Sequence, residues 1–207
     1  SGLFDWGAAI TSVQYSVAAA VATVIAAIPI SVLSVRRPGI LSTGLERFSY
    51  VGFAMPGIAV ALGLVFFGIR FATGIYQTAY LLMFAYVVLF LPVAVGLIRS
   101  SLLQVNPRME EAAMSLGRSQ INAFLTVTVP VIRPGLAAAA IMVFLLTMKE
   151  LPATLILGPI ESRTLATSIW SAAEEAFFAR AAAPSLLLVI ASAAPMTFLV
   201  LRERSRN

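Results

Sequence analysis

Four long stretches of this sequence contain no charged residue, and this feature constrains the fold more than any other. They are Trp6 to Val35, Phe48 to Ile69, Phe71 to Ile98 and Ala181 to Leu201. Each exceeds the roughly 20 residues that an α-helix needs to cross a hydrocarbon core about 30 Å thick. The chain is 60% apolar and only 11% charged, whereas soluble domains are about 25% charged. The sequence therefore predicts an integral membrane protein built of helices.

A fifth apolar run, Pro134 to Met148, is short for a span. It crosses a bilayer only if it also includes Val131–Arg133 at one end or Lys149 and Glu150 at the other. We therefore expect an all-α integral membrane helical bundle with five transmembrane helices, forming one domain over residues 1–207. The expected spans lie near 10–34, 50–69, 77–98, 131–150 and 183–201.

The distribution of basic residues indicates how the bundle is oriented. Of the 14 Lys and Arg residues, four belong to one side of the predicted membrane, namely Arg70, Lys149, Arg163 and Arg180. The other ten lie in segments 36–49, 99–133 and 202–207, and they are Arg36, Arg37, Arg47, Arg99, Arg108, Arg118, Arg133, Arg202, Arg204 and Arg206. Basic residues favour the cytoplasmic side. We therefore expect the N-terminus outside and the C-terminus inside.

The residue types that are absent narrow the possible chemistry. The chain has no cysteine and no histidine, which removes thiolate metal sites, thiol nucleophiles and the commonest general base. No segment resembles a phosphate-binding P-loop. We therefore expect neither enzyme activity, nor a bound cofactor, nor a stable metal site in this chain.

A short amphipathic helix is predicted within the cytoplasmic loop 99–130. Asn106 is a suitable N-cap, and Pro107 suits the first turn, where the N–H that proline lacks is not needed. Glu110 and Glu111 follow in the early turns, where the helix dipole favours negative charge. An apolar stripe at helical spacing is formed by Met109, Ala112, Ala113 and Leu116.

A second short helix is predicted to follow directly. Gly117 is expected to end the first helix, and Ser119 to cap a second one that continues through Phe124. The predicted product is a helix–glycine–helix elbow outside the membrane. The residues alone leave open whether this elbow lies on the bilayer surface or binds a cytoplasmic partner. The two glutamates fit anionic lipid headgroups poorly.

The spacing within this elbow resembles the EAA signature of ATP-driven (ABC) importer permeases. Glu111-Ala112-Ala113 is followed by three residues, Gly117, nine residues, and Val127-x-Val129-Pro130. The family signature has isoleucine and leucine in place of the two valines. The resemblance implies that the elbow is a coupling helix that contacts a separate ATP-binding subunit, through Glu110, Glu111, Ala112, Ala113, Gly117 and Pro130.

The same resemblance implies a set of partners and a location. ATP and Mg would bind to the partner ATP-binding subunits, and an extracytoplasmic solute-binding protein would deliver the substrate. A second permease half, or a second copy of the chain, would complete the pathway. The protein would be a multi-pass component of the bacterial cytoplasmic (inner) membrane.

A second notable segment follows the short fifth run. Lys149 and Glu150 adjoin the predicted span, and ionisable groups at such places tend to face a cavity or a partner. Pro152, Gly158 and Pro159 interrupt the apolar residues that follow, which favours a broken or re-entrant piece lining the bundle interior. The alternative is an interfacial charge pair followed by a surface loop. On the first interpretation, the substrate pathway includes Lys149, Glu150, Pro152 and Thr154.

The run Lys149-Glu-Leu-Pro-Ala-Thr154, with 181–185 leading into the last span, resembles the C-terminal half of ferric-iron-type permeases. Those proteins typically carry two fused copies of such a half, and the resemblance implies ferric iron as the substrate. The alternative substrates are thiamine, a polyamine or an oxyanion, because importers of all these share the EAA elbow. A gradient-driven transporter or a structural membrane subunit are the alternatives of another class. Against the former, the spans hold almost no ionisable residue that would relay ions.

Overall fold

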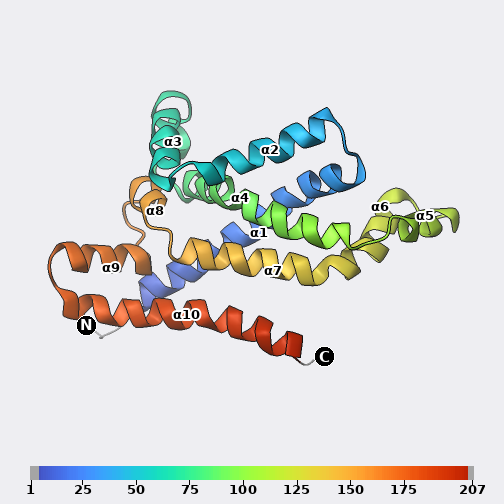
Figure 1. The fold of residues 1–207 in the computed structure, drawn as a ribbon. Coiled ribbons are helices and arrows are strands. Elements are labelled where there is room, and N and C mark those ends of the chain that lie inside the picture. Colours follow the sequence, from blue (N-terminus) through green and yellow to red (C-terminus); the bar gives the residue numbers. More distant parts are fainter. Residues whose placement is uncertain (1–4, 205–207) are drawn as a thin grey trace.

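The computed structural model describes residues 5–204, and every regular element within them is a helix (Figure 1). Helices pass between two ends of the bundle, which confirms the predicted all-α membrane fold. The passes are α1 (Trp6–Arg36), the pair α2 (Ile40–Ala54) and α3 (Gly57–Phe71), α4 (Ala79–Leu103), α7 (Val129–Met148) and α10 (Phe178–Arg204). Four helices are long and apolar enough to cross a membrane, and the bent pair α2–α3 makes a fifth candidate. Arg206, which we assigned to the cytoplasmic side, lies outside the described residues.

The core of the bundle is formed where α1 packs against α4 and α7. The inward face of α1 carries small residues, including Ala19, Thr23 and Ala27, all of which are fully buried. Small side chains allow helix backbones to approach closely in a membrane. α4 fills the space with larger side chains such as Leu82 and Tyr86. The α1 hydroxyl group of Ser31 also donates a hydrogen bond to the carbonyl of Val95 in α4, at 3.3 Å.

The second pass is not the single helix expected over 50–69. α2 and α3 meet at 103°, and the break falls at Met55, which has an extended backbone (φ −93°, ψ 134°). Proline disfavours the helical conformation in the residue before it, so Pro56 accounts for the position of the break. The consequence is that α3 lies across the outer part of the bundle, where it packs against α8 (Pro152–Leu157).

The helix expected over 131–150 is displaced toward its N-terminal end. α6 (Gln120–Ala123), a π-helical turn (Phe124–Thr128) and α7 form one continuous helical run, Gln120–Met148. Pro152 has no N–H to donate to the carbonyl of Met148, and it stands instead as the first residue of α8, where that bond is not needed. The span therefore gains its length at its N-terminal end, and Lys149 and Glu150 lie beyond its last residue.

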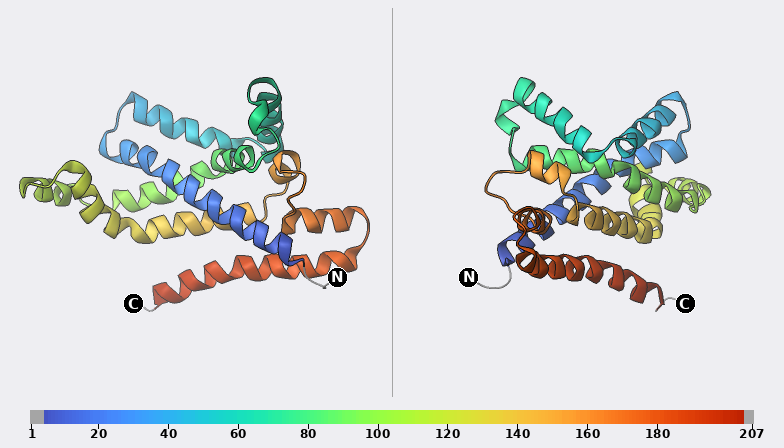
Figure 2. Two further views of the ribbon diagram at one scale, coloured as in Figure 1. Left: turned by 180° about the vertical axis from the view of Figure 1, so that it is seen from behind. Right: turned by 60° about the vertical axis from the view of Figure 1, so that its left-hand side comes forward.

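The two ends of the bundle carry different elements. α5 (Arg108–Ser115) and α6 project at one end, and α8 and α9 (Leu165–Glu174) lie at the other (Figure 2). The described chain begins at the α8–α9 end and finishes nearer the α5–α6 end (Figure 1). The two segments singled out in the sequence are therefore at opposite ends of the molecule.

Candidate functional site

The elbow begins with a side-chain cap and a proline. The Oδ1 atom of Asn106 accepts a hydrogen bond from the backbone N–H of Arg108 at 3.0 Å. The backbone N–H groups of Glu110 and Glu111 donate to the carbonyl of Pro107 at 3.0 and 3.2 Å. Asn106 and Pro107 thus lead into α5 one residue later than the sequence predicts, because Pro107 is the N-cap and Arg108 the first helical residue, and both glutamates lie in the first turn.

A left-handed glycine ends α5. Gly117 has φ 86°, a conformation that costs little only for residues without a Cβ atom. The N–H of Gly117 donates to the carbonyl of Met114 at 2.9 Å, and that of Arg118 to Ala113 at 3.2 Å. These two bonds are the Schellman pattern that satisfies free carbonyls at a helix end. The left-handed backbone at position 117 therefore explains why the signature has a glycine there.

Ser119 then starts the next helix. Its Oγ atom accepts a hydrogen bond from the N–H of Asn122 at 3.3 Å, as expected for an N-cap. α6 does not end at Phe124 as expected, because the π turn continues it into α7. The turn ends at Thr128, two residues before Pro130, and in a regular α-helix a proline ring clashes with the carbonyl four residues earlier, here that of Thr126 inside the turn. Pro130 thus marks where the elbow joins the span.

The predicted coupling residues differ in which way they face. Glu111, Ala112 and Gly117 are exposed, and so is Pro130 at the start of α7, whereas Ala113 is buried. The apolar stripe is not turned into the bundle, because Met109 is 47% and Leu116 is 86% exposed. The tip of the elbow therefore presents backbone, small side chains and two large apolar side chains outward.

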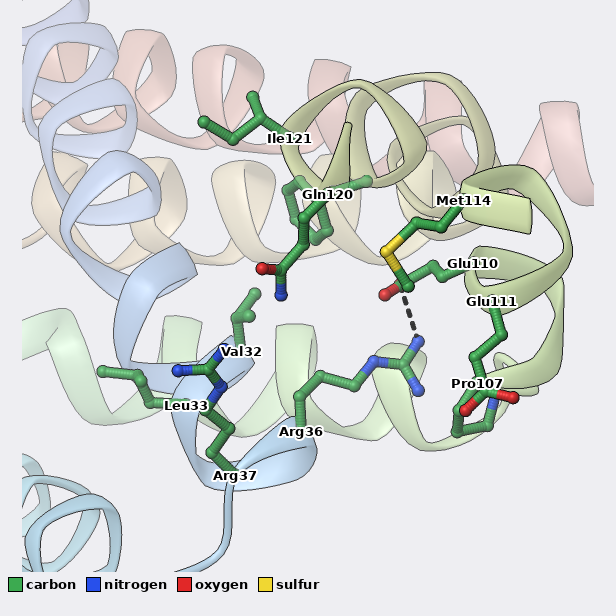
Figure 3. Close-up of a pocket in the computed structure, with 11 residues that line it drawn as sticks. Val32, Leu33, Arg36, Arg37, Pro107, Glu110, Glu111, Met114, Gln120 and Ile121 are labelled. Carbon is green, nitrogen blue, oxygen red and sulfur yellow. Dashed lines mark hydrogen bonds and ion pairs between the residues drawn. The ribbon is translucent and has the colours of Figure 1, made fainter. Parts of the chain in front are cut away.

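Glu110 points the other way, toward the end of α1 (Figure 3). Its Oε1 atom lies 3.0 Å from an Nη atom of Arg36, and each side chain is only 15% exposed. The hydroxyl group of Thr128 donates to the same carboxylate oxygen. Arg36 also donates to the carbonyl of Val105 at 3.4 Å. In the sequence, Arg36 is recognisable only as a marker of topology, and no pattern points to Thr128 as a partner of Glu110.

A cavity of about 430 Å³ separates the end of α1 from the elbow (Figure 3). α1 contributes both apolar and basic residues to its wall, and the elbow contributes the two glutamates and apolar side chains. The lining residues are Val32, Leu33, Arg36, Arg37, Pro107, Glu110, Glu111, Met114, Gln120, Ile121 and Phe124. The elbow is thus attached to α1 at a few polar contacts and is not packed solidly against it.

At the opposite end, the predicted pathway residues form a helix cap. Lys149 is the exposed C-cap residue of α7. The Oε1 atom of half-buried Glu150 accepts a hydrogen bond from the N–H of Ala153 at 3.1 Å, and Pro152 is the exposed first residue of α8. The start of α3 lies beside this carboxylate, because a Cβ atom on Gly57 would stand 3.1 Å from Oε1. Glu150 therefore has a structural role that its sequence context did not reveal.

Thr154 is buried inside the bundle. Its hydroxyl group donates to the carbonyl of Glu150 at 2.6 Å and lies 2.6 Å from the hydroxyl group of Tyr86. Leu157, one turn later in α8, is also buried. This is the broken helical segment that Pro152 and Gly158 predict, whereas no sequence pattern points to its partner Tyr86 in α4.

A polar outer cavity of about 1000 Å³ lies next to α8. Its wall comes from the end of α8 and the loop after it, from α9 and from the start of α10. Four charged side chains line it, namely Asp5, Arg163, Glu175 and Arg180, and hydroxyl groups such as those of Ser168 and Ser171 lie between them. Of the four residues predicted for the pathway, Thr154 lines this cavity, and the other three do not.

Comparison with known proteins places this arrangement in a family. Residues 20–202 match the family model described as binding-protein-dependent transport system inner membrane component. The chain is 39% identical over 180 residues to the Fe(3+)-transport system permease protein FbpB 2 of Haemophilus influenzae, which covers 87% of this chain and 36% of that protein. It is 28% identical over 148 residues to the putative 2-aminoethylphosphonate transport system permease protein PhnV of Salmonella typhimurium, covering 70% of this chain and 55% of PhnV. The chain thus spans about a third of one relative and about half of the other.

Solved structures share the fold. A chain of the methionine ABC transporter MetNI, solved in inward-facing conformations, superposes with a TM-score of 0.76 at 16% identity, covering 97% of this chain and 94% of that one. A chain of an amino acid ABC transporter superposes with a TM-score of 0.70 at 18% identity, covering 98% and 94%. The chain has the fold of an ABC transporter permease and belongs to the family of binding-protein-dependent transport system inner membrane components.

Proposed function

We propose that this chain forms half of the substrate pathway of an ATP-driven importer for ferric iron in the bacterial inner membrane. The observation that carries the proposal is the 39% identity to a ferric-iron permease, which extends over 87% of this chain. The other half comes from a second permease unit or a second copy of the chain. Separate ATP-binding subunits hold ATP and Mg, and an extracytoplasmic solute-binding protein delivers the iron.

The elbow is the part that contacts the ATP-binding subunit. Its exposed tip, with Glu111, Ala112, Leu116 and Gly117, supports this role, and buried Ala113 anchors the tip. Binding and hydrolysis of ATP would favour one packing of the spans over another, because the partner subunit has a different affinity for each. At the outer end, Lys149, Glu150, Pro152 and Thr154 belong to the segment that lines or supports the pathway.

Uptake by reconstituted vesicles tests the substrate. The full permease that contains this chain is reconstituted with its ATP-binding subunit and binding protein, and uptake is measured with and without ATP. We expect ATP-dependent uptake of ferric iron, and none of molybdate or 2-aminoethylphosphonate; relatives of lower identity are named for the transport of molybdenum and of 2-aminoethylphosphonate. Uptake of either of those in place of iron would overturn the substrate assignment and leave the family assignment standing.

Two substitutions in the elbow test the coupling role. Glu111→Ala removes an exposed charge, and a lost charge-assisted contact of about 1.5–3 kcal/mol weakens partner binding roughly tenfold or more. Glu174→Ala is the matched control, because Glu174 is an exposed glutamate at the other end of the bundle. Gly117→Val strains the left-handed turn, whereas Gly117→Asn is better tolerated there. Wild-type uptake and partner binding in both Glu111→Ala and Gly117→Val would refute the assignment.

A further inference from the structure

The two adjacent glutamates of the elbow have different surroundings. Glu111 is exposed, whereas the Glu110 side chain is 15% exposed and lies against Arg36. One oxygen of Glu110 accepts from both Arg36 and Thr128. A carboxylate that is withdrawn from solvent and already paired offers little to an incoming protein surface. The local geometry therefore separates the functions of two residues that the sequence groups together.

Three segments of the chain meet at the Glu110 carboxylate. Arg36 is the last residue of α1, and it also donates to the carbonyl of Val105, just before the elbow. Glu110 stands in the first turn of α5. Thr128 is the last residue of the π turn, where the chain enters α7. The start of the elbow, its exit and the end of α1 are thus joined through a single group, and Figure 3 shows the contact of this group with Arg36.

Most of the surface of both Arg36 and Glu110 is withdrawn from solvent, because each side chain is only 15% exposed. Charges interact more strongly where the local dielectric constant is low, and removing one partner of a buried pair leaves the other charge uncompensated. The second ion pair found in the described residues, Arg99 with Glu46, joins α4 to α2 and has side chains 40% and 21% exposed. Greater exposure makes an ion pair weaker, so the Arg99–Glu46 pair serves as an internal comparison for the Arg36–Glu110 pair.

We propose that Glu110 is a positioning residue that carries a displacement of the elbow to α1 through Arg36 and to α7 through Thr128. Glu110 does not contact the ATP-binding subunit, which docks on the outward side of the elbow at Glu111. The cavity between α1 and the elbow leaves the two without solid packing there, so the polar contacts transmit the movement. This inference rests on the proposed coupling function of the elbow.

The test separates partner binding from transmission in the reconstituted full permease. Glu110→Gln preserves size and removes the charge. We expect the affinity for the ATP-binding subunit to stay within about twofold of wild type, and iron transported per ATP hydrolysed to fall about fivefold or more, as loss of a typical coupling free energy would cause. The matched control Glu46→Gln, at the more exposed pair, keeps the wild-type ratio. Glu111→Ala shows the converse pattern, with lost affinity.

Variants that exchange the charges of Arg36 and Glu110, and a variant of Thr128, test the same proposal. Arg36→Glu lowers transport per ATP, and Arg36→Glu combined with Glu110→Arg restores part of it. If Glu110→Gln fails to accumulate, Thr128→Val, which preserves shape, carries the test and lowers the ratio in the same direction. Loss of subunit affinity in Glu110→Gln, or an unchanged ratio in both Glu110→Gln and Thr128→Val, overturns the proposal.

Amide hydrogen exchange tests the role of Glu110 independently of which substrate is transported. Adding the ATP-binding subunit and ATP should change amide exchange at residues 33–37 of α1 in the wild-type permease, and not in Glu110→Gln. If iron is not transported but this difference is observed, the substrate assignment fails and the role of Glu110 stands. If exchange in α1 responds equally in both proteins, the role of Glu110 fails whatever the substrate.

Discussion

The hydroxyl groups of Tyr86 and Thr154 lie 2.6 Å apart inside the bundle and join α4 to α8. Because the Thr154 hydroxyl donates its proton to the carbonyl of Glu150, the Tyr86 hydroxyl is the donor in the bond between them. Both residues are buried, at 1% and 5% exposure. α8 is therefore held to the central helix α4 by a hydrogen bond between two buried side chains.

Substitutions at this pair should have unequal effects. Tyr86→Phe removes one hydrogen bond and is expected to lower the free energy of unfolding by about 1 kcal/mol. Thr154→Val leaves the Tyr86 hydroxyl buried without an acceptor and should cost about 1–3 kcal/mol. In the double variant no unpaired hydroxyl remains, so its loss should be smaller than the sum. Unfolding in detergent measures all three, and additive losses would contradict the assigned bond.

A close approach of α7 to α4 should make Gly135→Ala destabilising. A Cβ atom on Gly135 would lie 1.8 Å from the Oγ atom of Ser101 and 2.6 Å from its Cβ atom. Overpacking of this kind costs about 1–3 kcal/mol, and Ser101→Gly in the same chain should recover most of it. Gly63→Ala is the control, because no atom lies within 4 Å of its added Cβ. Thermal unfolding in detergent compares the variants; a Gly135→Ala protein as stable as wild type would show that the helices are further apart.

Accessibility to a membrane-impermeant thiol reagent should differ between the two ends. The chain has no cysteine of its own, and both Ser119 and Ser171 are exposed, so each accepts a nearly isosteric cysteine. The bias of basic residues places Ser119 in the cytoplasm and Ser171 outside. Ser119→Cys should label in inside-out vesicles and Ser171→Cys in right-side-out vesicles. Labelling of both from the same side would refute the topology.

Two substitutions of Glu150 should separate a structural role of its side chain from an electrostatic one. Glu150→Gln retains an oxygen for the N–H of Ala153, so α8 keeps its cap, whereas Glu150→Ala loses the cap at a cost of about 1 kcal/mol. If the carboxylate meets a cation in transit, Glu150→Gln lowers ferric-iron uptake roughly tenfold, the effect of about 1.4 kcal/mol. Glu174→Gln, at an exposed site in α9, is the control. Unchanged uptake in Glu150→Gln would leave only the capping role.

Features that depend on nearby residues were predictable from the sequence. Long uncharged runs marked the helices, because a run of that length has few other places to be buried. Gly117 and Ser119 marked the ends of the short helices, because left-handed backbone and N-caps select particular side chains. Pro152 marked a break for the same kind of local reason, whereas the break at Pro56 falls inside the single helix expected over 50–69.

Features that depend on distant residues were not predictable. Glu110 and Glu111 are neighbours with the same charge, and what turns one of them inward is Arg36, 74 positions away. Tyr86 and Thr154 are separated by 68 positions, and no periodicity links them. The 103° angle between α2 and α3 is likewise set by what α3 packs against, because a proline determines the position of a break and not its angle.

The uninterrupted helical run from Gln120 to Met148 has a mechanical consequence. Its 29 residues make a rod roughly 43 Å long at about 1.5 Å per residue. A tilt of roughly 5° about its lower end would sweep the upper end through roughly 4 Å at that length, more than the diameter of a water molecule. The elbow and the Lys149–Glu150 turn lie at the two ends of this run, so a small rotation at the elbow becomes a larger displacement at the turn that leads into α8.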